Sequence, residues 1–172
     1  MSELRLAIID KDVPIEDVAC GVSSIDSLQK DAFCRTLFKQ ALAYNIIVDK
    51  CLVGTCMIKL VRLCDANKDY CVGEPECVAL EITYIAVGEK YQNKRIGTNV
   101  LNLLILRARK WSTQLPIRFL IIDSLPDKEQ WYTLAGFRRY PKREDLRRPG
   151  TVPMLIDLMD TKAAEQYAAS YC

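Results

Sequence analysis

Residues 81–104 read EITYIAVGEKYQNKRIGTNVLNLL, and this stretch predicts a buried strand, a polar turn and a helix in direct succession. The strand is expected over 78–87, because apolar residues occupy both of its faces, as is typical of a strand inside a sheet. A polar, basic segment follows over 88–95, and helical spacing of apolar residues then predicts a helix over 96–111. A strand that runs through a tight turn into a helix is therefore the centre of the predicted fold.

The turn and the start of this helix form a candidate anion site. The first amides of a helix lack partners within it and lie at the positive end of its dipole, and successive amides in such a turn form a concave anion nest. Gly97 lets the backbone come close to a ligand, while Lys94 and Arg95 add positive charge. An ordinary strand–turn–helix unit with a structural glycine is the alternative. The dinucleotide pattern Gly-x-Gly-x-x-Gly and the Gly-x4-Gly-Lys-Ser/Thr pattern are absent from the sequence.

The remaining segments predict a mixed α+β domain. Apolar, β-branched runs predict a hairpin over 45–49 and 52–63, with Gly54 at a bulge. Helical spacing predicts a helix over 25–44, capped by Ser23 or Ser24. Further strands are expected over 4–10, 117–125 and 151–159, helices over 126–135 and 161–171, and irregular segments over 13–24 and 64–76. At this length we expect residues 1–172 to form a single domain.

Composition excludes several kinds of chemistry. The chain of 172 residues has a net charge of +2 and no histidine, which excludes Ser-His-Asp and Cys-His nucleophile pairs and histidine-ligated metals. Its eight cysteines form no Cys-x-x-Cys pair, so we expect no metal site. No apolar run reaches the length of a membrane helix and the N-terminus does not resemble a secretory signal. We therefore expect a cytoplasmic protein without a membrane partner.

Three motifs in register resemble the GNAT acetyltransferase superfamily. Residues 91–98 (YQNKRIGT) are similar to its acyl-CoA signature, Gln/Arg-x-x-Gly-x-Gly/Ala, and residues 85–87 (IAV) to its central strand. Residues 131–137 (WYTLAGF) are similar to its later Phe-Tyr-x-x-x-Gly-Phe motif. The resemblance covers about residues 78–137 well and the rest in the order of elements. It implies a three-layer α+β fold with a mixed, mostly antiparallel sheet, flanked by helices and splayed at the central strand.

The resemblance also implies acetyl-CoA as co-substrate, with direct attack of a primary amine on the thioester in a ternary complex. Arg95 stands where the signature usually has its first glycine. It is strained if the position requires positive φ, and it adds a phosphate contact if the position lies on the helical side. The implied cofactor-binding residues are Ile85, Ala86 and Val87 for the pantetheine arm and Gln92, Asn93, Lys94, Arg95, Ile96, Gly97 and Thr98 for the pyrophosphate.

Transfer to an amine requires a base that removes a proton from the ammonium, and it benefits from an acid that protonates the leaving thiolate. Glu81 matches the general-base glutamate of the histone-acetyltransferase branch; the alternative is a strand residue paired with a Lys or Arg. Tyr132 matches the tyrosine that many members place beside the CoA sulfur; the alternative is an aromatic packed beside Trp131. Asp123 and Ser124 either orient substrate or cap the next helix.

A front motif at residues 19–26 (ACGVSSID) resembles the Cys-Gly-x-x-x-Leu/Ile-Asp opening of a bacterial GNAT subgroup. That subgroup includes toxins of toxin–antitoxin systems that acetylate the amino group of aminoacyl-tRNA. The basic segment 138–148 suits such an acceptor. The low net charge suits it less well, as does Glu81, where the toxins usually carry an arginine.

Three functions therefore remain open. The first is an N-acetyltransferase for a small-molecule or peptide amine, and the second is a toxin that acetylates aminoacyl-tRNA and has an antitoxin partner. The third is a non-catalytic CoA-binding regulatory module, because a fold does not fix a function. A second copy of the chain, in a homodimer, is a further candidate partner.

Overall fold

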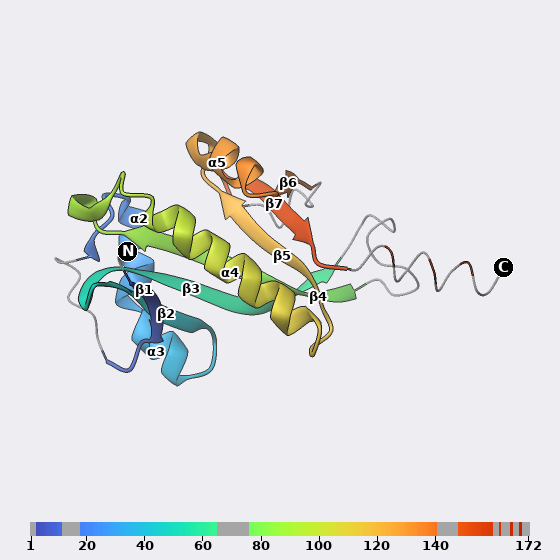
Figure 1. The fold of residues 1–172 in the computed structure, drawn as a ribbon, viewed down its shortest axis with the longest axis horizontal. Helices are drawn as coiled ribbons and strands as arrows, with labels where there is room; N and C mark the ends of the chain where they lie inside the picture. Colours follow the sequence, from blue (N-terminus) through green and yellow to red (C-terminus); the bar gives the residue numbers. More distant parts are fainter. Residues whose placement is uncertain are drawn as a thin grey trace. The chain divides into compact units, whose positions relative to one another are not determined.

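The structure is a computed structural model that describes residues 3–11, 18–64, 76–140 and 148–159, together with Lys162, Gln166 and Ala169 (Figure 1). Seven strands form one sheet in the order β1-β2-β3-β4-β5-β7-β6. In chain order the elements are β1 (Leu4–Ile8), α2 (Ser23–Lys30), α3 (Ala32–Leu37), β2 (Leu42–Val48), β3 (Cys51–Cys64), β4 (Glu76–Val87), the 3-10 helix η1 (Glu89–Tyr91), α4 (Ile96–Ser112), β5 (Ile117–Ser124), the 3-10 helix η2 (Pro126–Lys128), α5 (Glu129–Leu134), β6 (Arg138–Arg139) and β7 (Val152–Asp157).

The pairs β1–β2, β2–β3, β5–β7 and β6–β7 are antiparallel. The predicted α+β class with a mostly antiparallel sheet is therefore confirmed, whereas the splay at the central strand stays a prediction. The chain divides into two compact units: Met1–Leu60 with Glu81–Leu104, and Val61–Leu80 with Ile105–Cys172. The single domain expected over residues 1–172 stays a prediction.

The first unit is built on the hairpin of β2 and β3, which the sequence predicted. The hairpin turn consists of Asp49 and Lys50, and both have positive φ, at 48° and 70°. The register shifts because Ile46 pairs with Gly54 while Ile47 pairs with Leu52, which confirms the bulge expected at Gly54. The bulge increases the local twist of β3 at the point where its backbone passes the end of β4.

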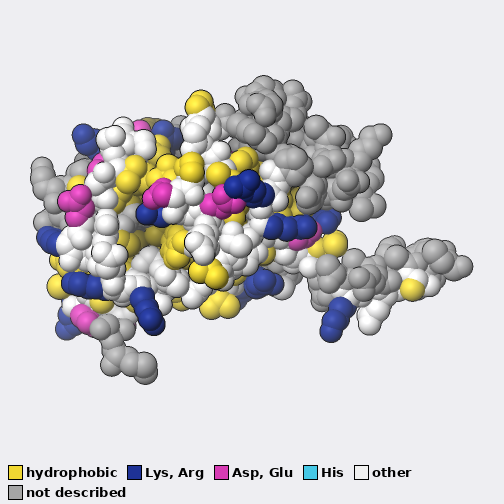
Figure 2. Space-filling model, turned by 90° about the horizontal axis from the view of Figure 1, so that it is seen from above, with side chains coloured by type: hydrophobic (Ala, Val, Ile, Leu, Met, Phe, Trp, Pro, Cys, Tyr) yellow, Lys and Arg dark blue, Asp and Glu magenta, His cyan; other side chains and the backbone are white. Residues whose placement is uncertain are grey.

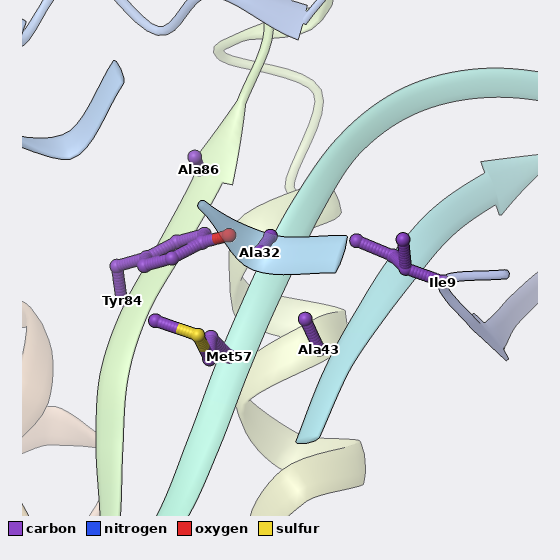
Figure 3. Packing of buried hydrophobic residues seen from close by; sticks show 6 residues of the cluster. All are labelled: Ile9, Ala32, Ala43, Met57, Tyr84 and Ala86. Atoms are coloured by element: carbon purple, nitrogen blue, oxygen red, sulfur yellow. The ribbon is translucent and has the colours of Figure 1, made fainter. Parts of the chain in front are cut away.

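A buried cluster fills one face of this unit (Figure 3). Tyr84 and Ala86 come from β4, Met57 from β3 and Ala43 from β2, and Ala32 brings the start of α3 against them. Small side chains at these positions let the helix approach the strands closely. The cluster fixes β4 against its neighbours, and β4 leads directly into the turn described below.

The helix expected over residues 25–44 is wrong in its second half. Two short helices, α2 and α3, replace it; α3 ends at Leu37, and Lys39 then takes a left-handed conformation at φ 57°. The Thr36 hydroxyl donates to the Ala32 carbonyl at 2.8 Å and accepts the Ala43 amide at 3.0 Å, so it links the helix to the first residues of β2. Leu37, Ala41 and Leu42 keep helical spacing across the boundary between α3 and β2, and periodicity alone could not separate the two.

The expected side-chain cap from Ser23 or Ser24 is also wrong. The residue before α2 is Val22, and no side chain caps the helix start. The acidic side chain in its first turn, Asp26, instead accepts the amide of Cys20 at 2.9 Å.

The second unit packs β5 against β7, with Phe119 opposite Asp157 and Ser124 opposite Val152. Arg118 and Asp157 form two hydrogen bonds of 3.1 Å across this pair. The short helical segment expected over 126–135 is confirmed as η2 and α5. The chain leaves α5 through Gly136 at φ +97°, a conformation that favours glycine.

Strand β6 was not predicted, because two residues carry no periodic pattern. The C-terminal helix expected over 161–171 lies outside the described residues apart from Lys162, Gln166 and Ala169, which are helical. Of the irregular segment expected over 64–76, residues 65–75 lie outside the described residues, and its two end residues belong to β3 and β4. Of the segment expected over 13–24, residues 13–17 lie outside them; residues 19–22 are irregular as expected, but α2 already begins at Ser23. No helix in the described part of the chain is long and apolar enough to cross a membrane.

Candidate functional site

The turn between β4 and α4 has the backbone shape of an anion nest. After η1, Gln92 is extended, and both Asn93 and Arg95 are left-handed, at φ 61° and 60°. The first hydrogen bond of α4 runs from the Asn99 amide to the Arg95 carbonyl at 3.0 Å. Left-handed residues next to a helix start turn consecutive amides toward one side, where they attract an anion. That an anion binds at this segment stays a prediction.

The charge around this turn is positive. Lys94 and Arg95 are exposed, and the first turn of α4 contains no acidic residue that would compete with an anion. The Nζ atoms of Lys90 and Lys94 lie 5.3 and 5.6 Å from the centre of the Tyr91 ring, which keeps both ammonium groups close to the turn. Because a helix N-terminus also attracts negative charge, a diphosphate would be stabilised here by amides and cations together.

Gln92 holds the turn in place through its side chain. Its Nε2 donates to the carbonyl of Val87 at the end of β4 and to the carbonyl of Cys20 in the front motif, each at 3.0 Å. The Glu89 amide donates to the Ala19 carbonyl at 3.0 Å. The front motif and the turn are thus hydrogen-bonded to each other although Gln92 and Cys20 stand 72 residues apart.

The end of β4 carries the residues expected to contact the pantetheine arm. Ala86 is 1% exposed, whereas Ile85 and Val87 are half-buried. Gly54 of β3 lies against this segment, and a Cβ atom at Gly54 would stand 2.2 Å from the Ala86 carbonyl oxygen. The Gly88 amide donates to the Val53 carbonyl at 2.9 Å. The bulge in β3 therefore fixes the backbone of the strand that leads into the turn.

Glu81, the candidate base, is buried in β4 and forms an ion pair with Lys59 of β3, with Nζ and Oε1 3.3 Å apart. The side chains of Lys59 and Glu81 are 32% and 10% exposed. The ion pair that the alternative interpretation of Glu81 predicted, with a lysine or arginine as partner, is therefore present. The contact also holds the carboxylate in one place, so its catalytic role stays a proposal.

The contacts of Glu81 also reveal an irregularity in β4. Lys59 contacts Glu81, while Thr55, four residues earlier in β3, contacts Tyr84. Positions separated by an even number share a face of a strand, but Glu81 and Tyr84 are three apart. These contacts indicate a β-bulge between Glu81 and Tyr84 that turns both side chains to one face. Bulges of this kind occur next to active sites, where they re-aim a side chain.

Tyr132, the candidate acid, lies in α5 of the second unit and is 7% exposed. Its ring packs edge-on against Trp131 and Phe137, with ring centres 4.6 and 5.6 Å away. Burial raises the pKa of the Tyr132 phenol well above its ordinary range. The phenol is therefore protonated at every pH near neutrality, as a proton donor must be. The packing against Trp131 that the alternative interpretation predicted is present as well. The catalytic role of Tyr132 stays a proposal.

Polar residues near the end of β5 have structural partners. The Ser124 hydroxyl donates to the Leu125 carbonyl at 2.8 Å, and it does not cap a helix. Asp123 forms an ion pair with Arg148 at 3.5 Å. In the basic segment, Arg139 also has an acidic partner, Glu129, while Lys142, Arg143 and Arg147 lie outside the described residues.

Figure 2 shows Lys and Arg side chains in several separate groups on the face it displays, with Asp and Glu among them. The described part of the chain contains no group of three or more His, Cys, Asp or Glu side chains placed to hold a metal ion. Burial raises the pKa of the Cys20 thiol to about 11, so Cys20 is not a thiolate near neutral pH.

Sequence reasoning missed a buried polar chain beside the candidate site. Gln29 of α2 donates to the Thr55 hydroxyl at 2.9 Å, and Thr55 donates to the Tyr84 hydroxyl at 3.3 Å. All three side chains are at most 3% exposed. Gln29 occupies a position of α2 that faces the core, and a glutamine among apolar residues at helical spacing was the available signal.

Comparisons with known proteins identify the fold. No family pattern and no curated protein match the sequence. A bacterial toxin of known crystal structure superposes with a TM-score of 0.75 at 18% identity, over 96% of this chain and 97% of that chain. The toxin AtaT in complex with acetyl-methionyl-tRNAfMet superposes with a TM-score of 0.73 at 14% identity, over 96% and 99% of the two chains.

A tyrosine-to-phenylalanine mutant of the toxin KacT gives a TM-score of 0.72 at 14% identity, over 95% of this chain and 98% of that chain. A tyrosine-to-phenylalanine mutant of AtaT, bound to the C-terminus of the antitoxin AtaR and acetyl-CoA, gives a TM-score of 0.72 at 15% identity, over 96% of this chain and 97% of that chain. At these identities the similarity establishes that the chain shares the fold of these toxins, over nearly its whole length.

Proposed function

We propose that the chain is an acetyl-CoA-dependent N-acetyltransferase that transfers an acetyl group to a primary amine by direct attack in a ternary complex. The observation that carries the proposal is the turn from Gln92 to Thr98. It joins a buried strand to a helix start through two left-handed residues and is surrounded by cations. The sequence of this turn resembles an acyl-CoA signature, and its left-handed residues beside a helix start are typical of turns that bind phosphate groups.

The chemistry of the turn fits coenzyme A. Its diphosphate needs several amide donors and positive charge, which the start of α4, Lys94 and Arg95 offer. Its pantetheine arm needs an exposed strand edge or half-buried apolar surface, which Ile85 and Val87 offer. The residues that would hold the coenzyme are therefore those predicted from the sequence, namely Ile85, Ala86, Val87, Gln92, Asn93, Lys94, Arg95, Ile96, Gly97 and Thr98.

Acetyl-CoA supplies the acetyl group as a thioester. We assign Glu81 as the base that takes the proton from the acceptor ammonium, and its ion pair with Lys59 as the contact that orients the carboxylate. We assign Tyr132 as the acid, since it matches the tyrosine that many members of the family it resembles place beside the CoA sulfur. The nitrogen–carbon bond forms as the carbon–sulfur bond breaks, and the thiolate takes the phenolic proton. The proton that the new amide nitrogen loses restores the phenol, and Glu81 releases the ammonium proton to solvent.

A second candidate acceptor is the amino group of aminoacyl-tRNA. It is favoured by structural similarity over nearly the full chain to AtaT, which was captured with acetyl-methionyl-tRNAfMet, and by complexes of AtaT with the antitoxin AtaR. Under this proposal the chain is a cytoplasmic toxin with an antitoxin partner. Glu81, which stands where such toxins usually carry an arginine, instead favours a small-molecule or peptide amine.

The proposal is tested with labelled acetyl-CoA and a panel of small amines, peptides and charged tRNA. We expect label transfer to at least one amine. Transfer to charged tRNA alone, with tRNA binding that weakens steeply as salt rises, would select the second candidate. Binding of acetyl-CoA without transfer to any acceptor would contradict the enzymatic proposal and favour a CoA-binding regulatory module.

Two variants test the assigned acid and base. Glu81→Gln and Tyr132→Phe should each retain coenzyme A affinity while turnover falls roughly a hundredfold or more, because each removes one proton transfer. Tyr132→Phe keeps the ring that packs against Trp131 and Phe137. Unchanged turnover in either variant would refute that residue's role, whereas a matching loss of stability would assign it to packing.

A further inference from the structure

The front motif contacts η1 and the turn through two hydrogen bonds and one close approach, and one further hydrogen bond holds each side in place. Cys20 is held at both of its backbone polar groups, since its amide donates to the Asp26 carboxylate at 2.9 Å and its carbonyl accepts from Gln92 at 3.0 Å. The same Gln92 amino group reaches Val87, and the Glu89 amide reaches Ala19. The two stretches of sequence that make up this unit are thereby joined at the turn.

The backbone conformation at position 21 favours glycine. Gly21 has φ +80°, and a Cβ atom there would stand 2.4 Å from Oε1 of Glu89. A larger residue would have a strained backbone, and the end of the flexible Glu89 side chain would have to move aside. Three residues of the front motif, Cys20, Gly21 and Asp26, thus each have a physical task in the same contact.

The geometry points to Gln92 as a positioning residue of the coenzyme site, with the front segment of residues 19–26 as its anchor. Both hydrogens of its amide are used on carbonyls of Val87 and Cys20. Its side chain therefore serves the diphosphate by fixing the backbone of the turn, and the amides at the start of α4 contact the anion. Preorganised donors bind an anion more tightly because no ordering cost remains at binding. This inference rests on the proposed function.

A double-mutant cycle on coenzyme A affinity tests the inference. Gln92→Met removes the two donors at similar volume, and Asp26→Ala releases the Cys20 amide. Each should weaken coenzyme A binding about threefold to tenfold in calorimetry, the size of one or two hydrogen bonds. The double variant should bind no more weakly than the weaker single variant, because both changes loosen one anchor.

Matched controls separate this from general damage. Asp26→Asn keeps the oxygen that accepts the Cys20 amide and should restore affinity. Gln114→Met places the same substitution at an exposed position after α4 and should leave affinity unchanged. Single effects that multiply in the double variant, or full affinity in Gln92→Met, would overturn the positioning role.

A second measurement needs no ligand. Hydrogen exchange of the Glu89 amide, which is bonded to Ala19, should become faster in both Gln92→Met and Asp26→Ala. If the wild type fails to bind coenzyme A, the proposed function falls, and this exchange rate alone decides the anchor. Unchanged exchange in both variants would refute the anchor even if the wild type binds the coenzyme.

Discussion

Replacing Arg95 with glycine separates the shape of the turn from its charge. Arg95 holds φ 60°, where an L-residue pays roughly 1–2 kcal/mol for the approach of its Cβ to the backbone. Glycine removes that cost, but its greater conformational freedom in the unfolded chain lowers the free energy of unfolding by about 0.5–1 kcal/mol. Arg95→Ala keeps the strain and also lacks the charge. We therefore expect Arg95→Gly to exceed Arg95→Ala in free energy of unfolding by about 1 kcal/mol, or about 2–4 °C in Tm at this length.

Thermal and chemical unfolding of the pair measure this difference. Arg109, an exposed residue of α4, provides the control, because glycine should there be less stable than alanine by about 1 kcal/mol in a helix. Coenzyme A affinity should fall similarly in Arg95→Gly and Arg95→Ala, since both lose the guanidinium. If Arg95→Gly were less stable than Arg95→Ala, the left-handed backbone at this position would be refuted.

Three further predictions concern the surroundings of the site. Gly54→Ala should lower the free energy of unfolding by about 1–3 kcal/mol and weaken coenzyme A binding, because the alanine Cβ would meet the Ala86 carbonyl. Wild-type stability in denaturation and wild-type affinity in calorimetry would contradict the close approach. Burial raises the pKa of Tyr84 to about 12, so the unfolded phenol ionises first and stability should fall above pH 10, by at most about 1.4 kcal/mol per pH unit. Denaturation between pH 8 and 11 should show a shallower fall in Tyr84→Phe, and an equal fall would assign the effect elsewhere. Lys59→Met should lower the free energy of unfolding by about 1 kcal/mol, because it leaves the buried Glu81 carboxylate without its lysine, and Lys59→Arg should restore the wild-type value. Equal denaturation midpoints for the wild type and both variants would mean that the ion pair adds nothing to stability.

The strand, turn and helix at residues 78–111 could be predicted because each is long or carries a distinct composition. β4 has apolar residues on both faces, and α4 has a regular apolar stripe, so local pattern and tertiary environment agree. The region around Leu42 could not be predicted in the same way. There the helical spacing of apolar residues continues from α3 into β2. The boundary depends on the left-handed Lys39 and on the hydrogen bonds of Thr36, which no periodicity reveals.

The candidate site divides along a similar line. The residues of the turn could be named from the sequence, because the signature is local. The sequence left two alternatives for Arg95, and the structure shows the positive φ. The partners of the turn could not be predicted, since the contact of Gln92 with Cys20 joins residues 72 apart. For Glu81 the sequence indicated the kind of partner, a lysine or arginine, but not that Lys59 provides it.

The most direct test follows the amides themselves. Nitrogen–proton spectra of the labelled protein, recorded during titration with coenzyme A, report on each backbone amide separately. The account predicts saturable shifts that are largest over residues 93–98, and much smaller ones when pantetheine, which lacks the diphosphate, replaces coenzyme A. Saturable binding of coenzyme A with these amides unmoved, or no binding at all, would contradict it.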